Sequence, residues 1–128
     1  MSGENYELGS ATPLLRMFDV AKAKAFYLDY LGFRVDWEHR YEPGMPLYMQ
    51  ISSGSCKLHL SEHHGDCTPG SAVRIEAANI RGYYDLLASR DYAYARPGLE
   101  RAFGGYEIRV VDPFGNRIVF YEQAKENG

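Results

Sequence analysis

Four side chains that could bind a metal or transfer a proton lie close together near the middle of the chain. They are His59, Glu62, His63 and His64, and imidazole and carboxylate groups are common ligands of zinc, iron and manganese. A strand would place His59 and His63 on one face only if it continued to His63, because side chains alternate. The stretch 63–70 is rich in turn formers and is predicted to be a solvated linker. We therefore expect His59 to be an interior histidine and do not favour a metal cluster here.

Other reactive groups give no stronger signal. The sequence contains no recognisable nucleophile with its base and no glycine-rich phosphate loop. Asp112 is expected to cap a turn, not to act in catalysis. Cys56 and Cys67 are expected to be free thiols, since a chain of 128 residues does not need a disulfide in a reducing cytosol; a disulfide between them is the less favoured alternative.

Composition narrows the class of protein further. The formal net charge of −3 gives no reason to expect nucleic acid as a partner. No apolar run approaches the roughly 20 residues of a membrane helix, and the polar N-terminus does not look like a signal peptide, so we expect a cytoplasmic protein with no membrane partner. The 11 tyrosines, 6 phenylalanines and 1 tryptophan suit a ligand cleft or a subunit interface, and we expect a homodimer.

The elements that must position these residues occur twice, 60 positions apart. Asp19 and Asn79 are suitable helix N-caps. Each is followed by apolar residues at helical spacing, and the matching pairs are Ala23 and Tyr83, Phe26 and Leu86, and Tyr27 and Leu87. Gly32 is expected to end the first helix. The second helix is expected to run from Asn79 to about Arg90.

A strand precedes each predicted helix, and three follow it. In the first half, alternation predicts strands at 14–17, 33–38, 47–51 and 56–60. In the second half, a strand at 73–77 precedes the helix, and the last strand, 117–122, follows a tight turn at 112–116. Each half is therefore βαβββ, and the fold class is α+β. We expect one domain over 1–128, with module one at about 8–62, a linker at 63–70 and module two at about 71–124.

Several motifs in this order resemble one protein family. They are Thr12-Pro13-Leu14-Leu15-Arg16, Asp19, Ala25-Phe26-Tyr27, Leu31-Gly32-Phe33 and Asp112-Pro113-Phe114-Gly115-Asn116. Together they resemble the vicinal-oxygen-chelate superfamily, which includes glyoxalase I, extradiol dioxygenases, fosfomycin-resistance enzymes and bleomycin-resistance proteins. The opening residues and the Phe26-Tyr27 and Leu31-Gly32-Phe33 motifs are most similar to the bleomycin-resistance branch. The resemblance implies two βαβββ modules whose sheets form a cleft.

Enzymes of this superfamily hold one divalent metal with four ligands, from the first and last strands of each module. The corresponding positions are Thr12, His59, Ala72 and Val119, and only His59 is a good ligand. Sliding the last strand would bring in Glu122, but that residue should point away from Val119, so this shift is not expected to supply a ligand. We therefore do not favour a metal cofactor, and we lean against an enzyme.

The same register predicts the side chains that line the cleft. These candidate ligand-binding residues are Arg16, His39, Tyr48, Gln50, His59, Arg74, Glu76 and Tyr121. Arg16 and Glu76 occupy equivalent places in the two modules, so a structural salt bridge between them is an equal alternative to a binding role. Trp37 is expected to pack in the core, whereas His39 could reach the mouth of the cleft.

Two main functions remain open from the sequence, and a purely structural or protein-interaction role is a third, less favoured because polar residues are predicted to face inward. The first is a metal-free protein that sequesters a bulky polar or aromatic compound in a dimer cleft, as bleomycin-resistance proteins do with glycopeptides of the bleomycin type. Arg16 and Arg74 would give the cleft a mixed charge, which leaves room for an anionic or zwitterionic ligand. The alternative is a metal-dependent enzyme of glyoxalase or dioxygenase type, or a metal-free enzyme that uses His59 and Glu76 as acid and base.

Overall fold

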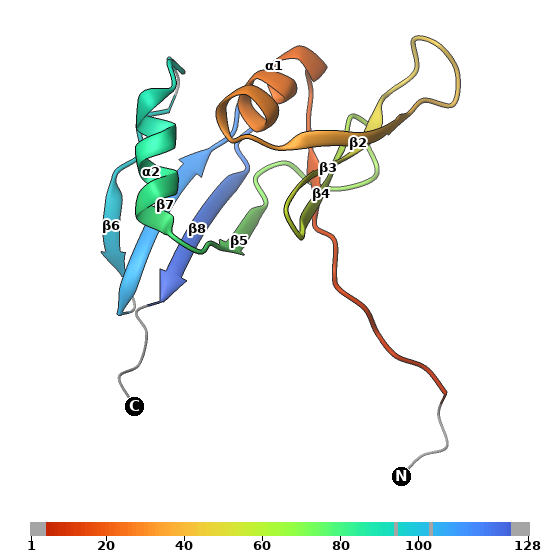
Figure 1. Cartoon of the computed structure of the whole chain (residues 1–128). Helices are drawn as coiled ribbons and strands as arrows, with labels where there is room; N and C mark the ends of the chain where they lie inside the picture. The colour runs from red at the N-terminus through yellow and green to blue at the C-terminus, as the bar shows by residue number, and fades with distance from the viewer. Residues whose placement is uncertain (1–4, 94, 103, 124–128) are drawn as a thin grey trace.

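The chain folds into two sheets of four strands, each with one helical segment on one side (Figure 1). A computed structural model describes residues 5–93, 95–102 and 104–123. The first module contains β1 (Leu14–Arg16), α1 (Val20–Lys24), η1 (Ala25–Tyr30), β2 (Arg34–His39), β3 (Tyr48–Ser53) and β4 (Cys56–Ser61). The second contains β5 (Ala72–Glu76), α2 (Ile80–Ser89), β6 (Leu99–Ala102), β7 (Gly105–Val111) and β8 (Arg117–Gln123). The α+β fold with two modules is thus as predicted.

The two sheets have the same topology and the same register. Their strand orders are β1-β4-β3-β2 and β5-β8-β7-β6, with the first pair of each sheet parallel. Leu14 lies opposite His59 in the first sheet, and Arg74 lies opposite Val119 in the second. Arg74 lies 60 positions after Leu14, and Val119 lies 60 positions after His59. The repeat in the sequence is therefore also a repeat of the strand pairing.

Both helices begin at the predicted caps. The side chain of Asp19 accepts a hydrogen bond from the Lys22 backbone N–H, and Asn79 accepts one from Gly82. The first helix ends as predicted, because Gly32 has a φ of 91°, which favours glycine. One feature was not predicted: from Ala25 onward the helix widens to π geometry, and the Leu31 N–H donates to the Phe26 carbonyl.

One side of each sheet packs against the helices to form the core. Met49 and Ile51 of β3 and Leu58 and Leu60 of β4 are fully buried on that side. They pack with aromatic residues of the first helix, in which Phe26 and Tyr27 are also fully buried. The side chains at alternating positions of the same strands point to the opposite side, which none of the described helices covers (Figure 1). In the described residues, no helix is long and apolar enough to cross a membrane.

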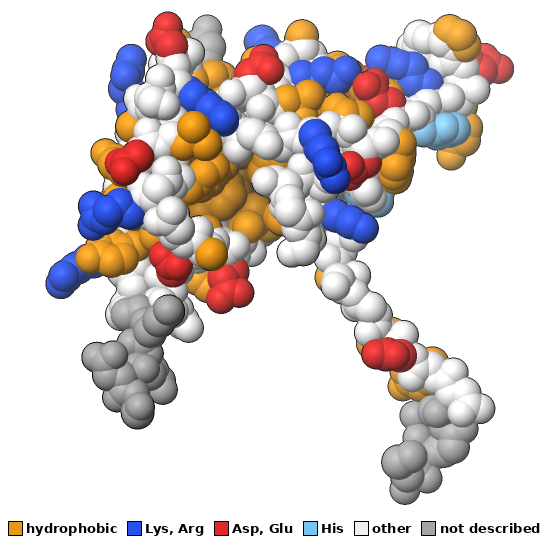
Figure 2. All heavy atoms as spheres, viewed as in Figure 1, with side chains coloured by type: hydrophobic (Ala, Val, Ile, Leu, Met, Phe, Trp, Pro, Cys, Tyr) orange, Lys and Arg blue, Asp and Glu red, His pale blue; other side chains and the backbone are white. Residues whose placement is uncertain are grey.

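The two modules meet on the helical side. The Tyr83 hydroxyl of α2 donates to the Leu31 carbonyl at 2.7 Å, and the Arg90 guanidinium donates to the Tyr30 carbonyl. These bonds satisfy carbonyl groups at the end of the first helix, which have no partner within the helix. Figure 2 shows hydrophobic side chains gathered in a hollow between α2 and the first module. A pocket of about 220 Å³ lies at this seam, lined by residues that include Phe33, Cys56, Tyr83 and Phe120.

A second seam contact uses the turn between β7 and β8. The Tyr27 hydroxyl donates to the Asp112 carboxylate at 2.6 Å, and the Asn116 side-chain amide donates to the Arg16 carbonyl at 2.8 Å. Asp112 also accepts from the backbone N–H groups of Phe114 and Asn116, so its predicted role as a turn cap is confirmed. Burial, together with the negative charge of Asp112, raises the pKa of Tyr27, which keeps the phenol protonated as a donor.

Candidate ligand-binding surface

The open side of the first sheet carries three of the predicted site residues in adjacent rows. Gln50 lies opposite His59 in the β3–β4 ladder, and Tyr48 lies opposite Ser61. All three predicted side chains are half-buried, in contrast to the fully buried Met49 and Ile51 that alternate with them on β3. The prediction that Tyr48, Gln50 and His59 share the face away from the helix is therefore consistent with the register.

Trp37 also lies on this open face, so the prediction that it packs in the core was wrong. Its side chain is 42% exposed. The cause is a β-bulge in β2: Val35 pairs with Ile51 and Trp37 with Gln50, which leaves Asp36 as an extra residue. Before the bulge, Val35 points toward the helix, and after it the alternation is reversed. Strict period-two reading of the sequence cannot detect this reversal.

Three rings and one amide form a compact group, which we call the aromatic row: Trp37, Tyr48, Gln50 and His59. The Trp37 and Tyr48 rings are stacked at 5.9 Å with an angle of 7° between their planes. The His59 ring meets both edge-on, with centroids at 5.3 Å from Trp37 and 5.2 Å from Tyr48. Such contacts hold the rings rigid, so the row offers a preformed flat surface to a ligand.

Hydrogen bonds fix the protonation of His59. Asp36 accepts from the Gln50 Nε2 atom at 2.9 Å, so the Gln50 Oε1 atom is the one that faces His59 Nε2, at 3.0 Å. An amide oxygen only accepts, which means that His59 Nε2 carries the proton. The Nδ1 atom then accepts from the Tyr48 hydroxyl at 2.6 Å. Burial lowers the pKa of His59, which also favours this neutral form.

The residues at the expected metal positions do not fit a divalent metal. Both ring nitrogens of His59 are engaged by neighbouring side chains. Thr12 is exposed and precedes β1, while Ala72 and Val119 have no ligating atom in their side chains. Glu122, from which a ligand could have been recruited, accepts from the backbone N–H groups of Asn79 and Ile80 and so points to the helical side, as predicted.

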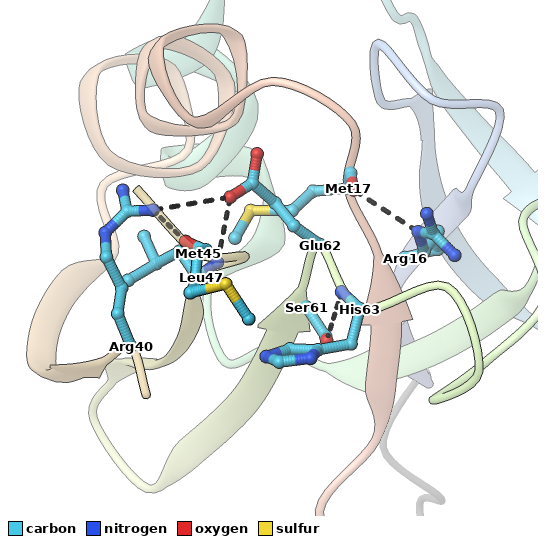
Figure 3. A network of polar contacts seen from close by, with 8 residues as sticks. All are labelled: Arg16, Met17, Arg40, Met45, Leu47, Ser61, Glu62 and His63. Atoms are coloured by element: carbon cyan, nitrogen blue, oxygen red, sulfur yellow. Dashed lines mark hydrogen bonds and ion pairs between the residues drawn. The ribbon is translucent and has the colours of Figure 1, made fainter. Parts of the chain in front are cut away.

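The His59–His64 stretch does not assemble a metal cluster either. Glu62 accepts from the Leu47 backbone N–H at 2.9 Å and lies 3.8 Å from Arg40, as Figure 3 shows. The His63 N–H donates to the Ser61 hydroxyl, and the His63 ring meets Tyr41 edge-on. Among the residues that the structure describes, no three His, Cys, Asp or Glu side chains are close enough together to hold a metal ion.

The open side of the second sheet carries a charged group around Glu107. This carboxylate is 1% exposed and accepts from Arg109 Nε at 3.0 Å and Nη2 at 2.9 Å, and from Arg74 Nη1 at 3.1 Å. The Arg74 guanidinium also lies over the Tyr121 ring, 4.6 Å from its centroid. The structure therefore brings together Arg74 and Tyr121, two of the candidate ligand-binding residues. Sequence reasoning missed Glu107 and Arg109, although their alternation with Ile108 and Val110 was a usable signal.

The other predicted site residues lie apart from these groups. Arg16 is 8% exposed, donates to the Met17 carbonyl at 3.4 Å and lies over the Phe18 ring. Its guanidinium is turned away from Glu62 (Figure 3). Glu76 is exposed at the end of β5, and in the described part of the chain it forms no ion pair with Arg16. His39 lies opposite Tyr48 and packs against Tyr41.

Neither thiol looks reactive. Cys56 and Cys67 are both free and half-buried, without a disulfide between them. Burial raises the pKa of the Cys56 thiol, and burial with the nearby negative charge of Asp66 raises the pKa of Cys67. A raised pKa lowers the fraction of nucleophilic thiolate at neutral pH, so the structure offers no support for cysteine chemistry.

The bonds around Glu107 predict a loss of stability in acid. The hydrogen bonds from Arg109 and Arg74 lower the pKa of Glu107 below its usual value of 4.5. A lowered pKa stabilises the fold at pH values above 4.5, and this contribution is lost as the pH falls through the folded-state pKa. We expect the free energy of unfolding, measured in urea between neutral pH and about pH 3, to fall in acid.

Two variants separate this contribution from general acid unfolding. Glu107→Gln should flatten the acid part of the pH profile, because the amide cannot titrate. Glu100→Gln is the matched control, since Glu100 is exposed and lies opposite Glu107 in the β6–β7 ladder. Equal slopes for the wild type and Glu107→Gln would show that the Arg74–Glu107–Arg109 group does not stabilise the fold.

Two sheets of this register, each helical on one side and open on the other, define the class of protein. The chain belongs to the glyoxalase superfamily: the family model described as glyoxalase superfamily protein matches residues 4–127. This agrees with the resemblance to the vicinal-oxygen-chelate superfamily stated from the motifs. A search of curated proteins found no significant match.

Solved structures show the same fold. A bleomycin-binding protein from Streptomyces verticillus, complexed with copper(II)-bleomycin, is 28% identical with a TM-score of 0.66, over 95% of this chain and 100% of that one. TnmS3, an antibiotic binding protein from a Streptomyces species, is 21% identical with a TM-score of 0.71, over 93% and 100%. A glyoxalase family protein from Bacillus anthracis is 19% identical with a TM-score of 0.67, over 94% and 99%.

Proposed function

We propose that this chain is a metal-free binding protein that sequesters a bulky, polar and aromatic compound of the bleomycin type in a cleft between two copies. The observation that carries this proposal is the aromatic row on the open face of the first sheet. Its stacked rings and fixed amide and hydroxyl groups are the kind of surface that orients a large ligand by stacking and hydrogen bonding. Similar structures that bind bleomycin or another antibiotic support the same class of ligand.

Sequestration requires affinity and no chemistry, which agrees with the side chains present. His59 is neutral and bonded at both nitrogens, so it is a poor base without rearrangement of Tyr48 or Gln50. Glu76, its partner in the acid–base alternative, lies on the other sheet, and among the described residues it forms no hydrogen bond or ion pair with the aromatic row. The geometry therefore favours binding over catalysis.

A second copy of the chain would complete the cleft. The first sheet leaves one face uncovered by the described helices, and that face carries the large side chain of Trp37, with 42% of its surface exposed. Residues 5–12 run as an exposed arm away from the body of the chain (Figure 1). In this proposal the open face of one protomer's first sheet closes against its partner, and the protein is a homodimer.

Titration of metal-stripped protein tests the proposal. With Zn²⁺, Mn²⁺ and Fe²⁺ we expect no stoichiometric binding in isothermal calorimetry, and with bleomycin we expect about one ligand per subunit. Sedimentation of the same samples should give the mass of a dimer. If one metal per subunit binds tightly and His59→Ala abolishes that binding, the chain is a metal-dependent enzyme and the sequestration proposal fails.

A further inference from the structure

A separate pocket lies where the first helix meets the end of β7. It has a volume of about 460 Å³ and is lined by Lys22, Ala25, Tyr92, Val111, Asp112 and Pro113. This size falls in the usual range for small-molecule sites. The pocket shares no residue with the aromatic row, with the Arg74–Glu107–Arg109 group or with the predicted metal positions. What it can bind is decided by its walls and by the charges that it presents.

The walls are apolar and held in place. The Tyr92 ring is stacked on Tyr30, with centroids at 4.7 Å and an angle of 18°, and it meets Phe26 edge-on at 5.7 Å. Ala25 is the first residue of the widened π segment, and its small side chain leaves room where a larger one would fill the pocket. A planar apolar group can therefore enter without moving the Tyr92 ring.

Of the two charged groups that line the pocket, the Lys22 ammonium group is more available to a ligand than the Asp112 carboxylate. The Asp112 carboxylate is 4% exposed and already accepts from Tyr27, Phe114 and Asn116, so it presents little negative charge to the pocket. Lys22 is exposed, and its ammonium group forms no salt bridge within the described residues. Lys22 and Ala25 are three residues apart, so they share one face of the helix. The pocket thus combines an apolar wall with one cation.

We propose that this pocket binds a small aromatic acid, with its ring against Ala25, Tyr92 and Val111 and its acidic group against the Lys22 ammonium. The site is independent of the proposed dimer cleft. An acid is favoured over an amine because Lys22 would repel a cation, while the Asp112 oxygens are occupied by donors. The acid must be small, since the pocket is bounded by the rigid Tyr30–Tyr92 stack and by the β7–β8 turn.

Two dyes of the same shape test the charge and the site. Anilinonaphthalene sulfonate carries an anion, whereas phenylnaphthylamine has the same aromatic body without charge. We expect fluorescence titration to give one sulfonate dye per chain, bound more tightly than the neutral dye. Lys22→Gln should weaken the sulfonate dye about threefold to tenfold and leave the neutral dye unchanged. Ala25→Trp should abolish binding of both dyes.

Two control variants and NMR chemical shifts show whether the dye binds in this pocket. Lys57→Gln removes an exposed cation from β4, and Ala11→Trp adds the same bulk on the exposed N-terminal arm, away from the pocket, so neither should change binding. The chain has 1 tryptophan, so the Trp37 indole gives one N–H resonance that reports on the aromatic row. We expect the sulfonate dye to shift the amide resonances of Lys22, Ala25 and Val111 and not the Trp37 indole.

The outcomes separate this inference from the proposed function. Dye binding that is unchanged in Lys22→Gln, or that shifts the Trp37 indole instead of the pocket amides, overturns the inference while leaving bleomycin binding to be judged by calorimetry. If Ala25→Trp does not fold, as judged by circular dichroism, the Lys22→Gln titration and the amide shifts decide alone.

Discussion

Replacing Asp112 with alanine is expected to lower the free energy of unfolding by about 3 kcal/mol, and the melting temperature by about 10 °C. The carboxylate is buried and accepts from the Tyr27 hydroxyl, two backbone N–H groups and the Asn116 side chain. Alanine would leave these donors without a partner at a buried position, and an unsatisfied buried donor is costly. Urea unfolding followed by circular dichroism measures the loss.

Two further variants show how much of the lost stability comes from the bond between Tyr27 and Asp112. Tyr27→Phe keeps the ring and removes only the hydroxyl, so it should lose about 1 to 2 kcal/mol if the link between the modules matters. Asp85→Ala, on an exposed position of α2, should change stability by less than about 0.5 kcal/mol. If Asp112→Ala were as mild as Asp85→Ala, Asp112 would be only a turn residue and the modules would be held by other contacts.

Replacing Trp37 with alanine is expected to weaken bleomycin binding about 30-fold, which corresponds to about 2 kcal/mol. The loss follows from removal of the large flat surface that is stacked on Tyr48 and held by His59. Because the Trp37 ring is outside the core, stability should change little. Calorimetry with bleomycin measures affinity, and thermal unfolding checks the fold.

The matched variants for this result are Trp37→Phe and Tyr41→Ala. Phenylalanine retains a ring at the same place and should recover much of the affinity. Tyr41 is also exposed, at 74%, but lies in the β2–β3 loop outside the aromatic row, so its removal should have little effect. Full affinity in dimeric Trp37→Ala would exclude the aromatic row as the bleomycin site.

The parts of the fold that depend on neighbouring residues could be predicted from the sequence. Asp19 and Asn79 start helices because their side chains reach the N–H groups of the next turn, and Gly32 ends one because its backbone conformation favours glycine. The constant offset of 60 residues then placed Tyr48, Gln50 and His59 on the face away from the helix. These inferences require only local chemistry and the alternation of strands.

The remaining features depend on contacts between distant segments. The bulge at Asp36 is a property of the pairing between β2 and β3, so the sequence of β2 alone could not reveal that Trp37 would leave the core. Tyr27 and Asp112 are far apart in the chain, and neither spacing nor composition indicates that they meet. Arg16 and Glu76 were matched by symmetry, but symmetry between modules does not require contact.

The extra residue at Asp36 divides β2 into two parts, one that packs in the interior and one that faces outward. Val35, before it, contributes to the interior that keeps the module folded, while Trp37 and His39, after it, face outward. Amino acids in the outer part can therefore be exchanged without disturbing the inner part, although both belong to one strand. Substitutions in the outward-facing part of β2 can thus change this surface while the buried scaffold stays the same.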